Sequence, residues 1–181
     1  MYEFYHIGVS EKTLKQSRKD IHNVYDSISE TEGCIENLPT CGAWCCEHQN
    51  PSVLYSEWLN TYWRISRDWS RAKLSDLFLR AVSTYIDANP TKGCVFWDKD
   101  SKHCMQHYTR PYNCRTYGQV PEEDFKPRYE RLKVLYADKT GAVIKDQCSL
   151  VKSSGKKPTV KDMTEWFEQL KIIERDILSD Q

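Results

Sequence analysis

The sequence predicts a mostly α fold, a single small helical domain with irregular cysteine-rich metal-binding loops. Apolar residues recur at helical spacing in long segments before, between and after two thiol-rich stretches, CGAWCC at 41–46 and the segment 93–115. Seven of the eight cysteines lie in or next to these stretches, and the long segment between them carries none. This distribution is typical of two cysteine-rich segments that bind metal together, with helices in the rest of the chain.

Length and composition predict one domain over 1–181. It divides into a helical N-terminal segment 1–33, a cysteine-cluster core 34–118 and C-terminal helices 119–181. The 26 basic and 26 acidic residues balance, so nucleic acid is not expected as a dedicated partner. The chain has no apolar run of about 18 residues, and its N-terminus has no basic start followed by an apolar core. We therefore expect a cytoplasmic protein with no membrane partner.

Each helix is predicted from its own apolar spacing and its ends. Ser10 is a candidate N-cap for a first helix that reaches Ile28. Two helices follow Pro51, with a break near 69–73 and an end at Asn89–Pro90. A further helix is expected from Pro121 to about Tyr136, and either a short strand or an extended loop at 141–144. Thr159 is a candidate N-cap for the last helix, whose apolar face runs from Met163 to Ile177.

An even number of cysteines also suits a disulfide framework, but disulfides are rare in reducing cytosol. The eight thiols divide into two sets of four, and four cysteines are the ordinary ligand set of a [4Fe-4S] cluster. No C-x2-C pair typical of structural zinc is present. The candidate ligands are Cys34, Cys41, Cys45, Cys46, Cys94, Cys104, Cys114 and Cys148.

Cys45 and Cys46 are adjacent, so their side chains diverge and can hardly serve one small centre together. One is a ligand and the other structural, or each faces a different centre. Cys148 is either the eighth ligand or a small buried apolar residue. Three histidines lie near the cysteines: His48, His103 and His107. Their imidazoles could ligate zinc, but we expect them to be non-ligands because thiols are abundant.

Two arginines, Arg110 and Arg115, lie beside Cys114 in the run Arg-Pro-x-x-Cys-Arg. They could offset thiolate charge and donate to sulfur, or form ordinary surface ion pairs. With Pro111 at the start of a short helix, Cys114 would lie on its first turn, where the helix N-terminus stabilises a thiolate.

Three segments of the second stretch, 93–96, 104–108 and 110–115, resemble the second half of the YkgJ-type cysteine-cluster (CxxCxxCC) family. The stretch 41–46 is similar to the family's upstream block, and the resemblance covers 34–118. The spacing Cys34-x6-Cys41-x3-Cys45-Cys46 departs from the family pattern, as does Val95, where proline is common. The resemblance implies zinc or iron–sulfur binding, without an assigned reaction for most members. Some relatives act as protein lysine methylases, but this chain has neither G-x-G-x-x-G nor a P-loop.

Three functions remain open from the sequence. The leading one is an iron–sulfur protein with one or two [4Fe-4S] clusters, in electron transfer or as part of a redox or modifying enzyme, with a redox or protein partner. The alternative is a zinc protein in which metal staples loops for partner binding, without catalysis. The third is a thiol enzyme with Cys46 or Cys148 as nucleophile.

Overall fold

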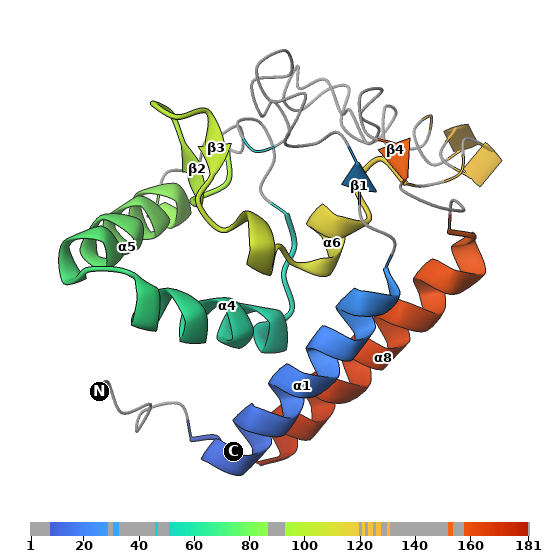
Figure 1. Cartoon of the computed structure of the whole chain (residues 1–181), viewed down its shortest axis with the longest axis horizontal. Helices are drawn as coiled ribbons and strands as arrows, with labels where there is room; N and C mark the ends of the chain where they lie inside the picture. Colours follow the sequence, from blue (N-terminus) through green and yellow to red (C-terminus); the bar gives the residue numbers. More distant parts are fainter. Residues whose placement is uncertain are drawn as a thin grey trace.

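The computed structural model describes residues 8–28, 31–32, 46, 51–86, 93–119, 121, 123–124, 126–127, 130, 152–153 and 158–180. Helices dominate these residues, so the mostly α prediction is confirmed. Figure 1 shows two groups: a pair of long helices, α1 and α8, and a more irregular group made of α4, α5, α6 and the β2–β3 hairpin. None of the helices in the described ranges is both long and apolar enough to cross a bilayer.

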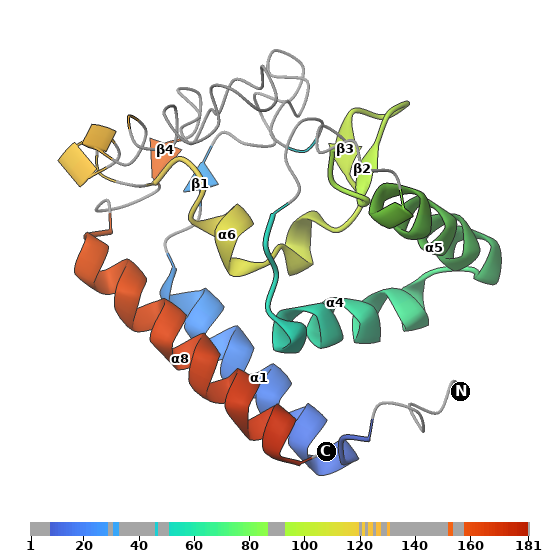
Figure 2. The same cartoon turned by 180° about the vertical axis from the view of Figure 1, so that it is seen from behind.

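Helices α1 (Glu11–Ser27) and α8 (Val160–Ser179) pack side by side in opposite directions, as both views of the ribbon show (Figures 1 and 2). The predicted caps are confirmed, because Ser10 Oγ accepts from Thr13 N and Thr159 Oγ1 accepts from Asp162 N, each at 3.2 Å. Asp180 Oδ2 accepts from Ser10 N at 2.9 Å and ties the start of α1 to the end of α8. Both helices are thus capped by a nearby side chain, and a hydrogen bond joins them at one end.

The main core lies where the apolar faces of α1, α4 and α8 meet. Its buried centre includes three side chains with no exposed surface, Ile21, Leu170 and Ile177. These residues lie on the apolar faces that the sequence predicts for the first and last helices. Tyr112 of α6 (Tyr112–Arg115) also belongs to this core. The end of the second thiol stretch is therefore built into the helical core.

Helix α4 (Tyr55–Asp68) begins against α8, and its first turn is capped from outside the helix. Glu174 of α8 accepts from Tyr55 N at 2.9 Å and from Ser56 N at 2.6 Å. A carboxylate at this position offsets the partial positive charge of a helix N-terminus. Trp69 and Ser70 separate α4 from α5 (Arg71–Ile86), so the predicted break is confirmed, although α5 begins earlier than its apolar pattern indicated.

The described strands are short and form two antiparallel pairs. β1 (Thr31–Glu32) pairs with the distant β4 (Lys152–Ser153), and β2 (Trp97–Asp98) pairs with β3 (His103–Cys104) in a local hairpin. We expected loops at all four places, since strands of two residues are too short to show an alternating apolar pattern. The short strand or extended loop predicted at 141–144 lies outside the described residues. So does much of the helix predicted from Pro121 to Tyr136.

Glu57 on α4 is a buried carboxylate that joins three parts of the fold. It is 2% exposed, and its Oε1 accepts from the Tyr25 hydroxyl at 2.6 Å and from Tyr112 N at 2.5 Å. Its Oε2 accepts from Leu54 N at 3.1 Å. Burial, followed by the charge of Glu57, raises the pKa of Tyr25 well above its ordinary value. The Tyr25 hydroxyl is thus held as a donor, and α1, α4 and α6 meet at one side chain.

We expect Glu57→Gln to lower the free energy of unfolding by about 2 to 3 kcal/mol, because the amide nitrogen replaces an oxygen that accepts buried hydrogen bonds. Chemical denaturation followed by circular dichroism measures the loss. The matched control is Glu165→Gln on α8, because Glu165 is exposed and pairs with Lys161 only at 3.8 Å. That control should change stability by less than about 0.5 kcal/mol. Equal losses in the two variants would contradict this role for Glu57.

Candidate metal centre

The β2–β3 hairpin presents the middle of the second thiol stretch. Its turn is stabilised by Asp98, whose carboxylate accepts from Ser101 Oγ at 2.6 Å and from Asp100 N at 3.4 Å. Lys102 completes the turn with a φ of 56°, in the left-handed region. Asp and Ser in this spacing are ordinary turn formers, so the run Asp98–Lys102 was a signal that we did not use.

Cysteines from both thiol stretches lie next to Trp97 on β2. The indole is 8% exposed and contacts Cys46 and Cys94, both half-buried. The amide of Cys94 donates to the carbonyl of Cys46 at 2.7 Å, which joins the first thiol stretch to the second. Cys104 is directly opposite Trp97 in the strand register. We call Trp97 with Cys46, Cys94 and Cys104 the Trp97 cluster.

Trp97 tests whether this cluster fits a metal with sulfur ligands. Its Nε1–H is buried and has no hydrogen-bond acceptor in the structure. A buried donor without an acceptor is costly, so such a group calls for an explanation. Thiolate and sulfide sulfurs accept N–H hydrogen bonds, and such bonds tune metal–sulfur sites. A donor of this kind beside two cysteines is what a metal–sulfur group would use.

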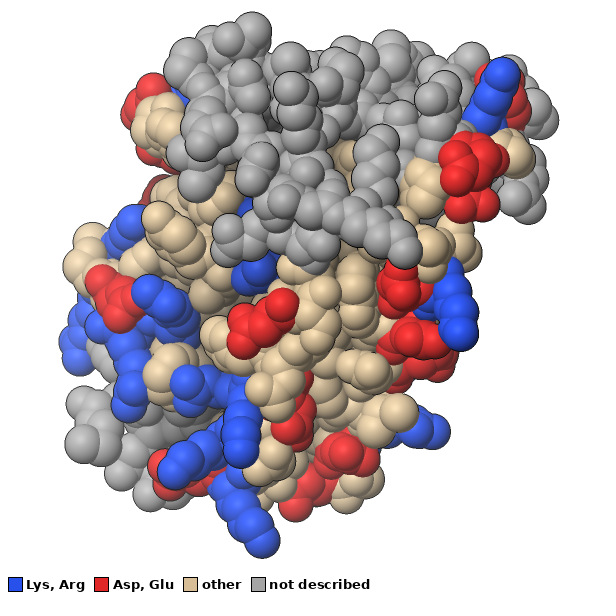
Figure 3. Space-filling model, turned by 45° about the vertical axis from the view of Figure 1, so that its right-hand side comes forward, with Lys and Arg blue, Asp and Glu red and all other residues tan. Residues whose placement is uncertain are grey.

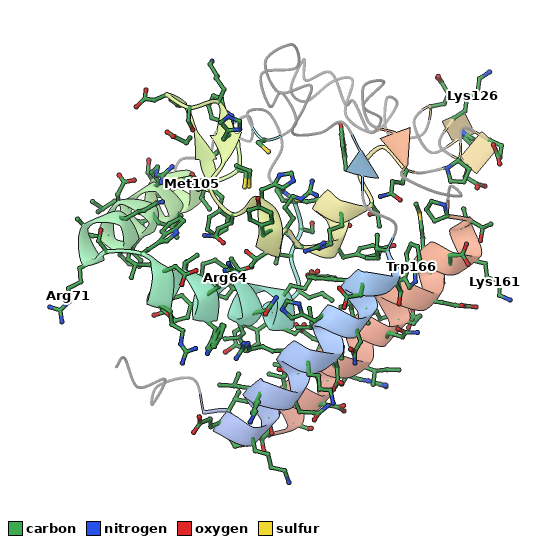
Figure 4. The ribbon with its side chains drawn as sticks, viewed as in Figure 1. Arg64, Arg71, Met105, Lys126, Lys161 and Trp166 are labelled. Atoms are coloured by element: carbon green, nitrogen blue, oxygen red, sulfur yellow. The ribbon has the colours of Figure 1, made fainter. Side chains whose placement is uncertain are left out.

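Arg80 of α5 contacts the β2–β3 hairpin through its guanidinium group. Its Nη1 donates to the carbonyl of Trp97 at 3.3 Å, and its Nη2 lies 3.8 Å from Met105 Sδ and 2.9 Å from Asp76 Oδ2. Figure 4 shows Met105 at the base of the hairpin, next to α5. The position of Trp97 is thus tied to α5 through its backbone.

The segment 108–119 joins the hairpin to the helical core. Thr61 Oγ1 on α4 donates to the carbonyl of Thr109 at 3.2 Å, and Asn113 Nδ2 donates to the carbonyl of Ser52 at 2.6 Å. The Tyr112 hydroxyl donates to the carbonyl of Met163 on α8 at 2.8 Å. These bonds fix α6, and with it Cys114, to two long helices.

Arg115 braces the polypeptide backbone in this segment. Its Nε donates to the carbonyl of Arg110 at 2.8 Å, and its Nη2 donates to the carbonyl of Tyr108 at 2.7 Å. Its guanidinium carbon also lies 4.2 Å from the centre of the Tyr25 ring. Burial is the main cause that lowers the pKa of Arg115 from its ordinary value. The structure thus gives Arg115 a role in holding the backbone of this segment, and the two roles considered from the sequence stay predictions.

His107 is held as a neutral imidazole in the short 3-10 helix His107–Thr109. Burial, and then the charges of Arg110, Arg115 and His103, lower its pKa to about 4. Neutral imidazole is the form that binds metal. His103 is exposed on β3, and His48 lies outside the described residues.

Of the predicted ligands, the structure describes Cys46, Cys94, Cys104 and Cys114, all half-buried. Cys114 lies on α6, as predicted, and its charge adds to the effects that raise the pKa of Tyr25. Within the described ranges, no three His, Cys, Asp or Glu side chains form a group that could hold a metal ion. The other candidates, Cys34, Cys41, Cys45 and Cys148, lie outside those ranges. Sequence reasoning missed Trp97 and Arg80, whose roles depend on contacts between distant segments.

The low pKa of His107 predicts a dependence of stability on pH. Because its pKa falls from 6.5 to about 4 on folding, the contribution of His107 is complete above pH 6.5 and is lost as the pH falls to about 4. We expect His107→Gln to lose less stability than the parent between these two pH values, as measured by denaturation at each pH. Identical pH profiles for parent and variant would show that the imidazole is not held neutral.

Comparison with family models gives one match. The model named CxxCxxCC, described as a "putative zinc- or iron-chelating domain", matches residues 33–149, which is more than half of the 181 residues. The chain belongs to this family, and the resemblance inferred from its motifs is confirmed. A comparison with curated proteins and one with solved structures each found no match.

Proposed function

We propose that the cysteines of this CxxCxxCC-family domain hold iron as one or two [4Fe-4S] clusters, in electron transfer or as part of a redox or modifying enzyme. The family is zinc- or iron-chelating, which supports metal binding as the general activity. Eight thiols without a C-x2-C pair favour clusters over a zinc knuckle.

The observation that carries the proposal is the Trp97 cluster. Cys46 and Cys94 are far apart in the sequence, yet their side chains contact the same buried indole. Cysteines brought together from separate loops, beside an N–H that has no acceptor, suit a group that offers several sulfur atoms. Bound there, a cluster would supply electron transfer or, with an open iron, catalysis. The chain would supply thiolates from both stretches, with Cys114 held on α6 and Trp97 as a hydrogen-bond donor.

Zinc is the alternative, and His107 is the observation that favours it. A half-buried imidazole with a pKa of about 4 is neutral at physiological pH and therefore ready to bind zinc. In that case the metal would staple the loops to the helical core for a protein partner, without catalysis.

The deciding experiment is anaerobic purification with an absorption spectrum and counts of iron, zinc and acid-labile sulfide per chain. We expect a brown protein with a broad band near ~400 nm and about four or eight each of iron and sulfide, for one or two clusters. A colourless protein with stoichiometric zinc would overturn the iron–sulfur proposal and support the alternative.

Trp97→Phe tests the proposed hydrogen bond to the metal group. Phenylalanine keeps an aromatic ring but removes the N–H, so we expect metal affinity to fall about tenfold, as for other hydrogen-bond partners of metal ligands. Competition with a chelator measures the affinity of the purified protein. The matched control is Trp69→Phe, because Trp69 is half-buried and packs against Phe96. A parent-like affinity in Trp97→Phe, or an equal loss in the control, would contradict the role of this N–H.

A further inference from the structure

Trp63 on α4 is contacted by two arginines that carry the same charge. The guanidinium carbon of Arg18, from α1, lies 3.0 Å from the centre of the indole, and that of Arg67, from α4, lies 4.2 Å from it. The two guanidinium carbons are therefore no farther apart than the sum of these distances. We call these two residues the Arg18–Arg67 pair.

Neither arginine of the pair has a carboxylate partner among the described residues. The nearest acid along α4, Asp68, is bound to Arg64 at 3.1 Å. The nearest acid along α1, Asp20, accepts from Gln16 Nε2 at 2.9 Å through each of its two oxygens. The acid nearest to each arginine along its own helix is thus engaged with another side chain.

The pair is also electrostatically unfavourable as it stands. Arg18 Nε is buried and has no hydrogen-bond acceptor in the structure. Burial, and then the charge of Arg67, lower the pKa of Arg18 from its ordinary value. Two charges of one sign, partly removed from water and with no carboxylate partner among the described residues, cost free energy that a bound anion would recover.

The two guanidinium groups differ in access, because Arg67 is exposed whereas Arg18 is half-buried with a buried Nε. Stacking on an indole uses the flat face of a guanidinium, whereas its N–H groups lie in the plane of the fork. These forks match the oxygens of a phosphate group, which can accept from both arginines at once. Exposed Lys15, one helical turn before Arg18, adds positive charge nearby. Figure 3 shows a face on which most Lys and Arg side chains gather to the left and most Asp and Glu side chains to the right.

We propose that Arg18 and Arg67, held on Trp63, form a binding site for a phosphate group. Phosphate is favoured over a carboxylate because its multiple negative charge can offset both arginines. A phosphate group could belong to a small phosphorylated compound or to the backbone of a nucleic acid. The balanced net charge of the chain favours the small compound.

The test uses the full-length, metal-loaded protein and two probes, inorganic pyrophosphate and a short single-stranded oligonucleotide. Calorimetric titration compares the parent with Arg18→Gln, Arg67→Gln and Arg64→Gln. The last is the matched control, since it removes the same charge from the same helix but from an arginine paired with Asp68. We expect at least one probe to bind, with affinity about tenfold lower in Arg18→Gln and in Arg67→Gln and nearly unchanged in Arg64→Gln.

Tighter binding of pyrophosphate would support a small phosphorylated ligand, and tighter binding of the oligonucleotide would support the same site with nucleic acid as the source. The proposal is overturned if the parent binds neither probe, or if all three variants weaken binding equally. Circular dichroism and metal counts show whether each variant is folded and loaded. If Arg18→Gln does not fold, the test compares the probe affinity of Arg67→Gln with that of Arg64→Gln. Both arginines are exposed on α4, so both variants are expected to fold.

Discussion

The packing of α1, α4 and α6 against one another depends on the buried carboxylate of Glu57. A charge that is 2% exposed is tolerated only when its oxygens accept good hydrogen bonds, and here the donors come from α1, from α6 and from the start of α4. The three hydrogen bonds share one side chain, so each stabilises the fold fully only when the other two donors are also in place. Glu57 therefore links the packing of the helices to the path of the second thiol stretch.

The second thiol stretch is held at two points that do not use cysteine side chains. Near its end, Tyr112 is fixed by Glu57 and by Met163. Near its middle, the carbonyl of Trp97 is fixed by Arg80. Because these anchors lie on different helices, the stretch crosses from α5 to the contact between α1 and α8. A metal held by these cysteines would therefore fix loops to a stretch that hydrogen bonds between nitrogen and oxygen atoms already attach to the helices.

Local signals in the sequence were enough to predict the helices, and contacts between distant segments were not. Ser10 and Thr159 cap helices through residues three positions away, so their roles can be read along the chain. Glu174 also caps a helix, but it caps α4 across 118 and 119 residues. Glu57 carries no local signal in the sequence that predicts its contacts with α1 and α6, because these partners lie 32 and 55 residues away. For the candidate metal centre, the motifs of the second thiol stretch carried the resemblance to the family, whereas the position of Trp97 beside Cys46 and Cys94 depended on the fold.

The role of Arg115 changes the view of how thiolate charge is balanced. From the sequence, a cation next to Cys114 could donate to sulfur. In the structure two of its nitrogens donate to backbone carbonyls, and its flat face lies on Tyr25. Beside Cys46 and Cys94, the indole N–H of Trp97 is a neutral donor. In the proposed metal centre, this N–H would stabilise negative sulfur without cancelling its charge, so the site would stay anionic. An anionic thiolate site attracts and retains a metal cation, as the function of a metal-chelating domain requires.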